Sequence, residues 1–196
     1  MRLIGTAVLL AATSTSAGAQ PAAFLPAKLY RTMFVEGTKV TLGGTRAENE
    51  GEERFRLRTR PAKVRCTVTN VRATADAIVA DLGCDKAMQA LGGAYGATAS
   101  GLYRIDQPSS ISVETIEMGA LAMPARPKVG KTTHGPTAHP LYEEQVTRSG
   151  SGFCHRITSV DGDTYSNRYC FAGGRLTAYE ADDGSSFPVV IKLARL

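Results

Sequence analysis

The chain has 196 residues, with 23 Lys and Arg against 18 Asp and Glu, and it contains four cysteines. A net charge of +5 is too modest to indicate a nucleic-acid-binding protein, and it favours a soluble chain without naming a partner. The length suits one domain that can bury its own hydrophobic core without help from a metal or a partner.

The N-terminal residues have the layout of a cleavable secretory signal. Arg2 precedes an apolar run at residues 3–12, and a small polar stretch ends in Ala17-Gly18-Ala19. A run of about ten residues is too short to span a bilayer, and no later segment is long and apolar enough to do so. We therefore expect a signal peptide over residues 1–19 and one domain over residues 20–196. The mature protein would be periplasmic or secreted, without a transmembrane anchor.

Residues 29–42 alternate loosely around Gly37 and stop at Gly43-Gly44, which predicts one strand or two short ones. The four cysteines then fall on two predicted hairpins, with Cys66 and Cys84 on the arms of the first and Cys154 and Cys170 on the arms of the second. In an oxidising compartment an even number of cysteines favours disulfides, here one within each hairpin. A zinc site is disfavoured because neither pair has the Cys-x-x-Cys spacing.

The register of each hairpin predicts which face is buried. Pairing Cys66 with Cys84 places Val68 opposite Leu82, so the first bridge should face the core. The second register predicts a buried aromatic face made of Phe153, Ile157, Tyr165, Tyr169 and Phe171. Arg156 would lie opposite Arg168 on the cysteine face, a like-charge pair that argues for solvent on that face or for a small shift of register.

Short strands and one helix are predicted for the rest of the chain. Asp85 as a helix cap and Gly92-Gly93 as a stop predict a short helix over residues 85–91. Residues 92–101 indicate a small-residue linker, residues 111–116 a strand, and residues 176–181 with 189–193 a final hairpin. The fold class is therefore mainly β, with about eight strands in one or more curved antiparallel sheets. The similar spacing of the two cysteine pairs leaves two similar β units open as an alternative.

Four segments follow one another in an order that resembles a loose group of uncharacterised bacterial exported β-rich proteins. They are Gly101-Leu102-Tyr103-Arg104, Pro127-Lys128-Val129-Gly130-Lys131-Thr132, Phe153-Cys154-His155-Arg156-Ile157 and Tyr169-Cys170-Phe171-Ala172-Gly173-Gly174. Those proteins often have Trp shortly after the Lys-Val-Gly-Lys segment, where this chain has Thr133. The resemblance implies a curved antiparallel sheet with a helix beside it, and it carries no catalytic residue across.

The three histidines are the candidates for catalysis or metal binding. His134 and His139 flank Pro136, and they could share a metal only on a helix, which Pro136 disfavours. His155 is interpreted as a hydrogen-bonded, half-buried core histidine, and a general base is the alternative. The segment at residues 149–152 lacks the nucleophile-elbow pattern and predicts a turn. The sequence predicts no cofactor, no metal site and no identified catalytic residue.

Arg54, Arg56, Arg58 and Arg60 form an alternating series that we call the arginine ladder. On a strand these side chains would point to one side at intervals of about 6.6 Å, a spacing that suits the phosphates or carboxylates of an anionic ligand. The alternative is neutralisation by the preceding acidic residues, and Pro61 indicates an edge strand. The acidic residues are Glu48, Glu50, Glu52 and Glu53.

These features favour a non-catalytic binding or assembly module outside the cytoplasm. Its partner would be an anionic envelope component or another envelope protein. Two alternatives stay open. A carrier of a lipid or other apolar ligand would have an apolar cavity under the sheet, and a hydrolase would join a histidine to Asp or Glu in a pocket.

Overall fold

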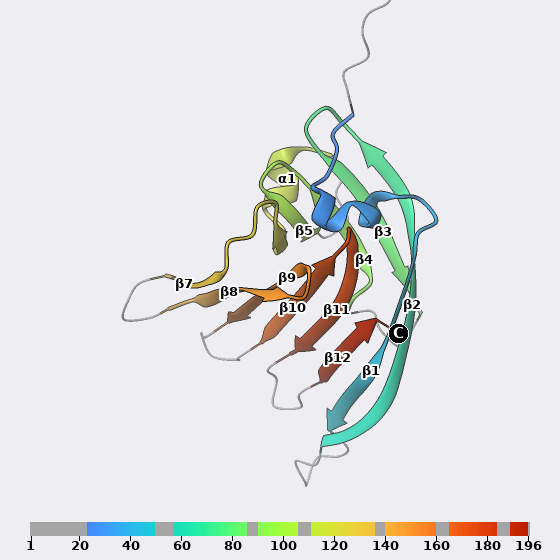
Figure 1. Cartoon of the computed structure of the whole chain (residues 1–196), viewed down its shortest axis with the longest axis vertical. Coiled ribbons are helices and arrows are strands. Elements are labelled where there is room, and N and C mark those ends of the chain that lie inside the picture. Colours follow the sequence, from blue (N-terminus) through green and yellow to red (C-terminus); the bar gives the residue numbers. More distant parts are fainter. Residues whose placement is uncertain are drawn as a thin grey trace, which may run out of the picture.

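The computed structural model describes residues 23–49, 57–85, 90–105, 111–135, 140–159, 165–183 and 189–195. Its strands form one open antiparallel sheet, which confirms the mainly β fold class (Figure 1). The sheet has twelve strands, more than the eight that the sequence predicts. The predicted signal peptide and most of the predicted helix over residues 85–91 lie outside the described residues.

The strands follow the chain in two series, and within each series every strand pairs with its neighbours in sequence. The first series is β1 (Lys39–Asn49), β2 (Leu57–Ala73), β3 (Ile78–Cys84), β4 (Gly93–Ala97), β5 (Gly101–Ile105) and β6 (Ala120–Pro124). The second series is β7 (Gly130–His134), β8 (Tyr142–Ser149), β9 (Gly152–Ser159), β10 (Ser166–Ala172), β11 (Arg175–Asp182) and β12 (Val190–Arg195). Pairing of β1 with β12 joins the two series. The edges of the sheet are therefore β6 and β7, two strands that are consecutive in the chain.

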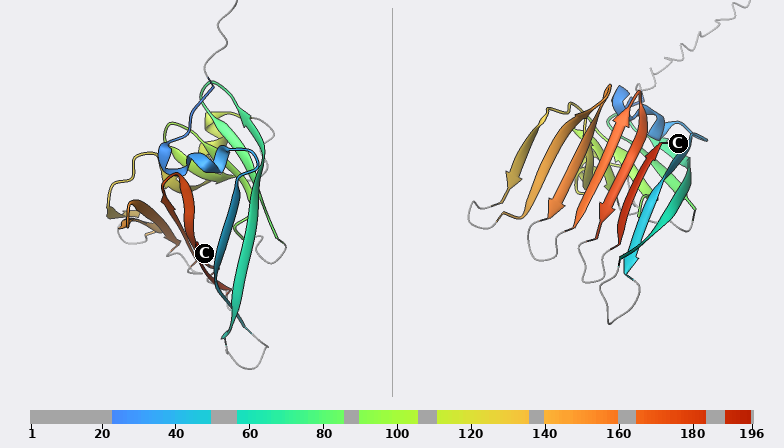
Figure 2. Two further views of the ribbon diagram at one scale, coloured as in Figure 1. Left: turned by 45° about the vertical axis from the view of Figure 1, so that its right-hand side comes forward. Right: turned by 60° about the horizontal axis from the view of Figure 1, so that its bottom comes forward.

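The sheet bends so far that its two halves face each other. In Figure 2, β7–β12 run side by side as one wall, and β2–β5 form the opposite wall. The edge strand β6 contacts β9 and β10, which belong to the opposite wall. The connection at residues 125–129 therefore runs from one edge of the sheet to the other.

The main hydrophobic core lies between the two walls. The register of the first hairpin is the predicted one, with Cys66 opposite Cys84 and Val68 opposite Leu82, and their face is buried. Tyr169 and Phe171 of β10 and Leu193 of β12 enter the same cluster from the other wall. Each large apolar side chain buried in this way stabilises the fold by about 1.5–3 kcal/mol relative to an exposed one.

A 3-10 helix, η1 (Lys28–Phe34), closes one end of the core where a strand was predicted. The prediction over residues 29–42 is wrong for its first part, where the apolar residues Tyr30, Met33 and Phe34 follow a helical spacing and are buried, and correct from Lys39, where β1 begins. The helix contacts β2 and β3 on one wall and β10 and β11 on the other. The Thr32 hydroxyl donates a hydrogen bond to the Gly174 carbonyl at 2.6 Å and fixes the helix to the β10–β11 turn.

The second helix, α1 (Val113–Glu117), occupies a segment that was predicted to be a strand. The Ser112 hydroxyl accepts a hydrogen bond from the Thr115 amide at 3.1 Å, and this cap favours a helix over an extended chain. Ile116 is fully buried against β4, where a Cβ at Gly96 would lie 2.8 Å from it. The helix therefore covers the outer face of the β3–β5 wall over a second, smaller apolar cluster.

Two glycine-containing segments that predicted breaks lie within the sheet instead. Strand β1 continues through Gly43-Gly44. Glycine is needed at position 44 because β12 approaches closely there, and a Cβ at Gly44 would overlap the Lys192 carbonyl. The segment predicted as a linker over residues 92–101 contains β4, and its small residues admit α1. The predicted end of the strand at Gly43-Gly44 and the predicted linker over residues 92–101 are both wrong, because the glycines there allow close packing and do not end a strand.

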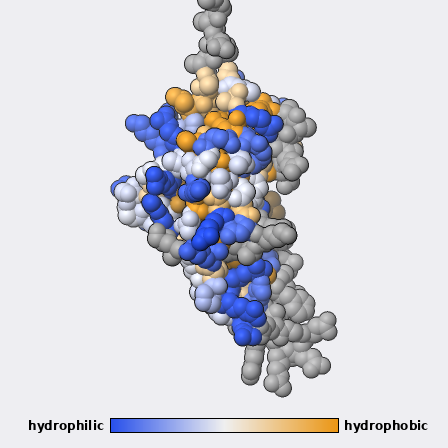
Figure 3. Space-filling model, turned by 90° about the vertical axis from the view of Figure 1, so that its right-hand side faces the viewer, coloured by the Kyte–Doolittle hydropathy of each residue, from blue (hydrophilic) through white to orange (hydrophobic). Residues whose placement is uncertain are grey.

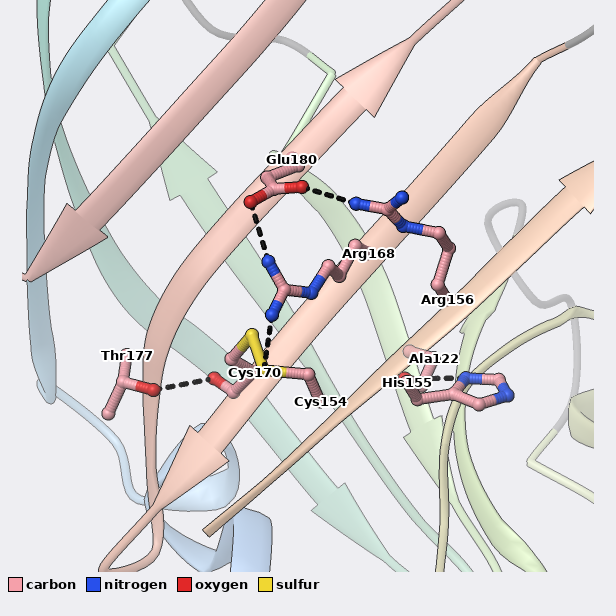
Figure 4. Close-up of a disulfide and its surroundings, with 8 residues drawn as sticks. All are labelled: Ala122, Cys154, His155, Arg156, Arg168, Cys170, Thr177 and Glu180. Atoms are coloured by element: carbon pink, nitrogen blue, oxygen red, sulfur yellow. Dashed lines mark hydrogen bonds and ion pairs between the residues drawn. A yellow bond between two sulfur atoms is a disulfide. The ribbon is translucent and has the colours of Figure 1, made fainter. Parts of the chain in front are cut away.

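Both predicted disulfides form, Cys66–Cys84 and Cys154–Cys170. In the second hairpin Arg156 lies opposite Arg168 in the predicted register, and the expected repulsion is relieved by Glu180 of β11. Its carboxylate accepts hydrogen bonds from Arg156 at 2.7 Å and from Arg168 at 2.6 Å (Figure 4). The other Nη atom of Arg168 lies 3.2 Å from Cys154 Sγ.

This arrangement corrects two expectations about the second hairpin. The cysteine face is not open to solvent at the bridge, because Cys154 and Cys170 are buried where Arg168 lies over the sulfur. The predicted aromatic face is buried at Tyr169 and Phe171, but Tyr165 is 44% exposed because it precedes β10 and does not reach the core.

Two disulfides fit an oxidising location. Over the described ranges, none of the helices is long and apolar enough to cross a membrane.

Candidate functional site

An open cleft of about 330 Å³ lies between the edge strand β6 and strands β7 and β8. Arg126 and Lys128 line it from the connection between the two edges, Thr132 lines it from β7, and Glu144 lines it from β8. The cleft therefore exists only because the sheet folds back and brings its two edges together.

Strand pairing explains why β8 brings Glu144 between two histidines. A tight turn at Gly150, where φ is +54°, sets Ser149 opposite Gly152 and therefore Val146 opposite His155. Glu144 is then a diagonal neighbour of His155 on the same face of the sheet. On its other side Thr132 lies opposite Glu144, which makes His134 a diagonal neighbour as well.

The carboxylate of Glu144 contacts one imidazole with each oxygen. Its Oε1 lies 2.9 Å from His155 Nε2, and its Oε2 lies 3.1 Å from His134 Nε2. The ring of His134 stacks on Tyr142 with 4.4 Å between ring centroids and 12° between planes. We call these three residues, His134, Glu144 and His155, the His–Glu–His cluster. The two imidazoles and the stacked tyrosine fix the position of the carboxylate in the cleft.

His155 is the buried member of the cluster, with 1% of its surface exposed. Its second ring nitrogen, Nδ1, lies 3.2 Å from the Ala122 carbonyl of β6 (Figure 4). Burial lowers the pKa of His155 below its ordinary value, and the neighbouring Glu144 carboxylate only partly opposes this effect. The imidazole is therefore neutral near pH 7 and has a single N–H to donate.

The charges on the cleft favour an anionic ligand. Arg126 and Lys128 are exposed, and the two imidazoles already engage the Glu144 carboxylate that lines the cleft with them. Lys131, whose side chain alternates away from Thr132, pairs instead with Glu143 at 2.8 Å. Two cationic side chains at the lining of a small cleft are suited to bind a carboxylate, sulfate or phosphate group.

The geometry of the cluster also permits proton transfer, because His134 is 34% exposed and contacts Glu144, which lines the cleft. A metal centre finds no support: within the part of the chain that the structure describes, no group of three or more His, Cys, Asp or Glu side chains could hold an ion. His139, the other member of the predicted histidine pair, lies outside the described residues.

The arginine ladder lies on the β1–β2 hairpin, away from the histidines. Arg58 and Arg60 share one face of β2, opposite Glu48 and Arg46 of β1, while Arg54 and Arg56 lie outside the described residues. Glu48 forms an ion pair with Arg46, an arginine outside the ladder, so this contact does not show that the acidic residues neutralise the ladder. Four strands separate β1 from β8 in the sheet, so the ladder and the cluster form no common site.

The β1–β2 hairpin lies in the lower part of the molecule (Figure 1), where the coloured residues are mostly hydrophilic (Figure 3). Strand β2 lies inside the sheet, yet its described pairing with β3 covers only Cys66–Ala73. Pro61, which cannot donate a backbone hydrogen bond, lies in the half that pairs with β1 alone. Strand β2 is therefore an edge strand only in the half that contains Pro61, as far as the described pairings show.

Sequence reasoning found both histidines but missed Glu144, Arg126 and Lys128. A signal for Glu144 was present, because it alternates in phase with the apolar Val146 and so lies on the inward face of its strand. No signal marked Arg126 and Lys128, because their position depends on the approach of two sheet edges.

Fold and cleft together define a disulfide-stabilised antiparallel sheet protein with a charged cleft between its two edges. Comparison of the chain with protein-family models, curated proteins and solved structures finds no match.

Proposed function

We propose that this protein is a non-catalytic binding module that works outside the cytoplasm and takes an anionic group into the cleft. The group is a carboxylate, sulfate or phosphate of an envelope or extracellular component. The observation that carries the proposal is the lining of the cleft, where Arg126 and Lys128 accompany a carboxylate that two imidazoles already hold.

The electrostatic balance of the cleft supports this choice. Both oxygens of Glu144 are engaged by imidazole N–H groups, so the carboxylate repels an incoming anion less than a solvated one would. Exposed cations contribute only about 1 kcal/mol each in water, so two of them imply a dissociation constant on the order of tens of millimolar for a small anion. A larger natural ligand would gain affinity from further contacts outside the cleft.

An export route supports a location outside the cytoplasm. The charged and apolar layout of residues 1–19 is typical of a cleaved signal peptide, and two disulfides fit an oxidising compartment. The segments that resemble bacterial exported β-rich proteins favour a periplasmic or secreted bacterial protein. Peptide sequencing of the mature N-terminus tests the cleavage, which we expect after Ala19.

Sulfate titration by calorimetry at low ionic strength tests the binding function. Replacing both cations, Arg126→Ala with Lys128→Ala, should weaken sulfate binding by about tenfold or more. A matched control replaces Lys39 and Arg175, which line a separate small opening, and should leave the affinity unchanged. Equal loss in both double variants, or no loss in the first, would contradict the proposed site.

The hydrolase is the second candidate function, because Glu144, which lines the cleft, contacts two histidines. His134, held by Glu144 and partly exposed, is the residue that would serve as general base. A panel of anionic esters tests it: turnover that disappears in His134→Gln would favour the enzyme, and binding without turnover would favour the module.

No comparable observation favours an apolar-ligand carrier. A cluster of buried side chains occupies the space between the two walls. Three openings bounded by described residues each have charged side chains in their lining.

A further inference from the structure

We infer that the cleft binds its anionic ligand more tightly in acid, because the His–Glu–His cluster takes up protons as the ligand binds. This inference rests on the proposed function, since it describes how the same cleft is regulated. Its physical basis is the arrangement of hydrogen-bond acceptors around His155, together with the position of Glu144 in the lining of the cleft.

The two contacts of His155 cannot both be hydrogen bonds when the ring is neutral. Its Nε2 faces a carboxylate and its Nδ1 faces the Ala122 carbonyl, and a carbonyl oxygen can only accept. A neutral imidazole has one N–H, which goes to the shorter, charge-assisted contact with Glu144. Protonation supplies the second N–H, and His155 then donates to β8 and β6 at the same time.

The second hydrogen bond connects the cluster to the basic side of the cleft. Ala122 lies in β6, the strand from which the connection carrying Arg126 and Lys128 departs. Protonated His155 therefore adds a positive charge beside the cleft and also ties down the strand that precedes both cations. An anion in the cleft and a proton on the cluster stabilise each other.

The other groups that face His155 allow the ring to become protonated when an anion binds. Strand β8 contributes Glu144, β10 contributes Tyr169 opposite the ring, and β6 contributes only the Ala122 carbonyl. His134 of β7 reaches His155 through the shared carboxylate. Tyr169 is hydrogen-bonded to Arg104, and Arg126 and Lys128 of the cleft oppose protonation until an anion neutralises them.

Linkage gives the direction of the effect. Burial keeps the pKa of His155 below its ordinary value in the free protein, so the ring is largely unprotonated near neutral pH and can accept a proton. A bound anion favours the protonated ring, and by reciprocity protonation favours the bound anion. Affinity therefore rises as the pH falls through the range in which the cluster titrates.

Calorimetric titration with sulfate between about pH 5 and pH 8 tests the inference, because sulfate keeps a constant charge over this range. For uptake of one proton, affinity should increase by several-fold and at most about tenfold for each unit of pH. Titrations in buffers with different ionisation enthalpies should show net proton uptake at the acid end of the range.

The double variant His134→Gln with His155→Gln should lose the acid gain in affinity and the proton uptake. His139→Gln, a change of the third histidine of the chain, is the matched control and should keep both. Circular dichroism checks that the variants fold, and the single variant His155→Gln should lose the proton uptake if the double variant does not fold.

The outcomes separate the two proposals. Sulfate binding with no pH dependence, or with a pH dependence that survives in the folded histidine variants, would overturn the inference and leave the anion-binding function standing. No sulfate binding at any pH would overturn the proposed function itself.

Discussion

His155 is an ionisable side chain that is almost fully buried, and this burial lowers its pKa below the ordinary value. The sequence predicts a hydrogen-bonded, half-buried core histidine, and the residue is hydrogen-bonded and even more completely buried. Its partner Glu144 could have been predicted from the turn at residues 149–152, because that turn sets the register that makes the two residues diagonal neighbours. The contact between His155 and the Ala122 carbonyl could not have been predicted, because β6 lies far from β9 in sequence.

The lowered pKa of His155 predicts how the ligand-free protein responds to acid. The unfolded chain regains an ordinary histidine pKa of about 6.5. Between that value and the lower folded value, the unfolded state binds more protons, so the free energy of unfolding decreases as the pH falls. The variant His155→Gln removes this pH-dependent contribution to the free energy of unfolding, and it also loses the hydrogen bond to the Glu144 carboxylate.

We expect His155→Gln to be less stable than the wild type by about 1–3 kcal/mol above pH 7, and this deficit should shrink toward pH 5. Urea unfolding at a series of pH values without added sulfate measures it. A deficit that stays constant with pH would show that His155 does not titrate with a lowered pKa in the folded protein.

Among the elements, the two cysteine hairpins are the ones that local sequence specifies best. Cysteines on both arms and a turn between them leave few registers, and alternation selects the one that buries the apolar side chains. Segments with mixed periods were predicted wrongly: residues 28–34 and 113–117 form helices because Tyr30, Met33 and Phe34 share a helical face and Ser112 provides a cap. A period of two and a period of 3.6 are hard to distinguish over so few residues.

The register of the second cysteine hairpin is stabilised in part by Glu180, a residue outside the hairpin. Glu180 of β11 bonds Arg156 and Arg168, the like-charged pair that local reasoning found unfavourable. Glu180→Gln should therefore lower the free energy of unfolding by about 1 kcal/mol at low ionic strength, and by less in high salt.

Thermal or urea unfolding of Glu180→Gln measures this effect, with Glu143→Gln as the matched control. Glu143 pairs with the single, more exposed Lys131, so its replacement should change stability by less than about 0.5 kcal/mol. Adding Arg156→Gln to Glu180→Gln should recover part of the loss. A loss at Glu180 no larger than at Glu143 would mean that the shared carboxylate does not stabilise the hairpin.

At the scale of the whole molecule, the sequence predicts the fold class but not the arrangement of the sheet. Pairing of β1 with β12 joins the two ends of the described chain, and contact of β6 with β9 folds the sheet on itself. Neither contact can be predicted from a local pattern in the sequence, because both depend on the curvature of the two series of strands. The cleft is a product of that curvature, which is why Arg126 and Lys128 carried no signal in the sequence.

The central claim is that an anion binds in this cleft and not at the arginine ladder, the other basic feature of the molecule. Titration of the isotope-labelled protein with sulfate, followed by amide chemical shifts in nuclear magnetic resonance, tests it directly at about pH 5.5. We predict saturable shifts concentrated at residues 122–132 and around Glu144 and His155. Shifts concentrated on the β1–β2 hairpin near Arg58 and Arg60, or the absence of saturable shifts, would contradict the claim.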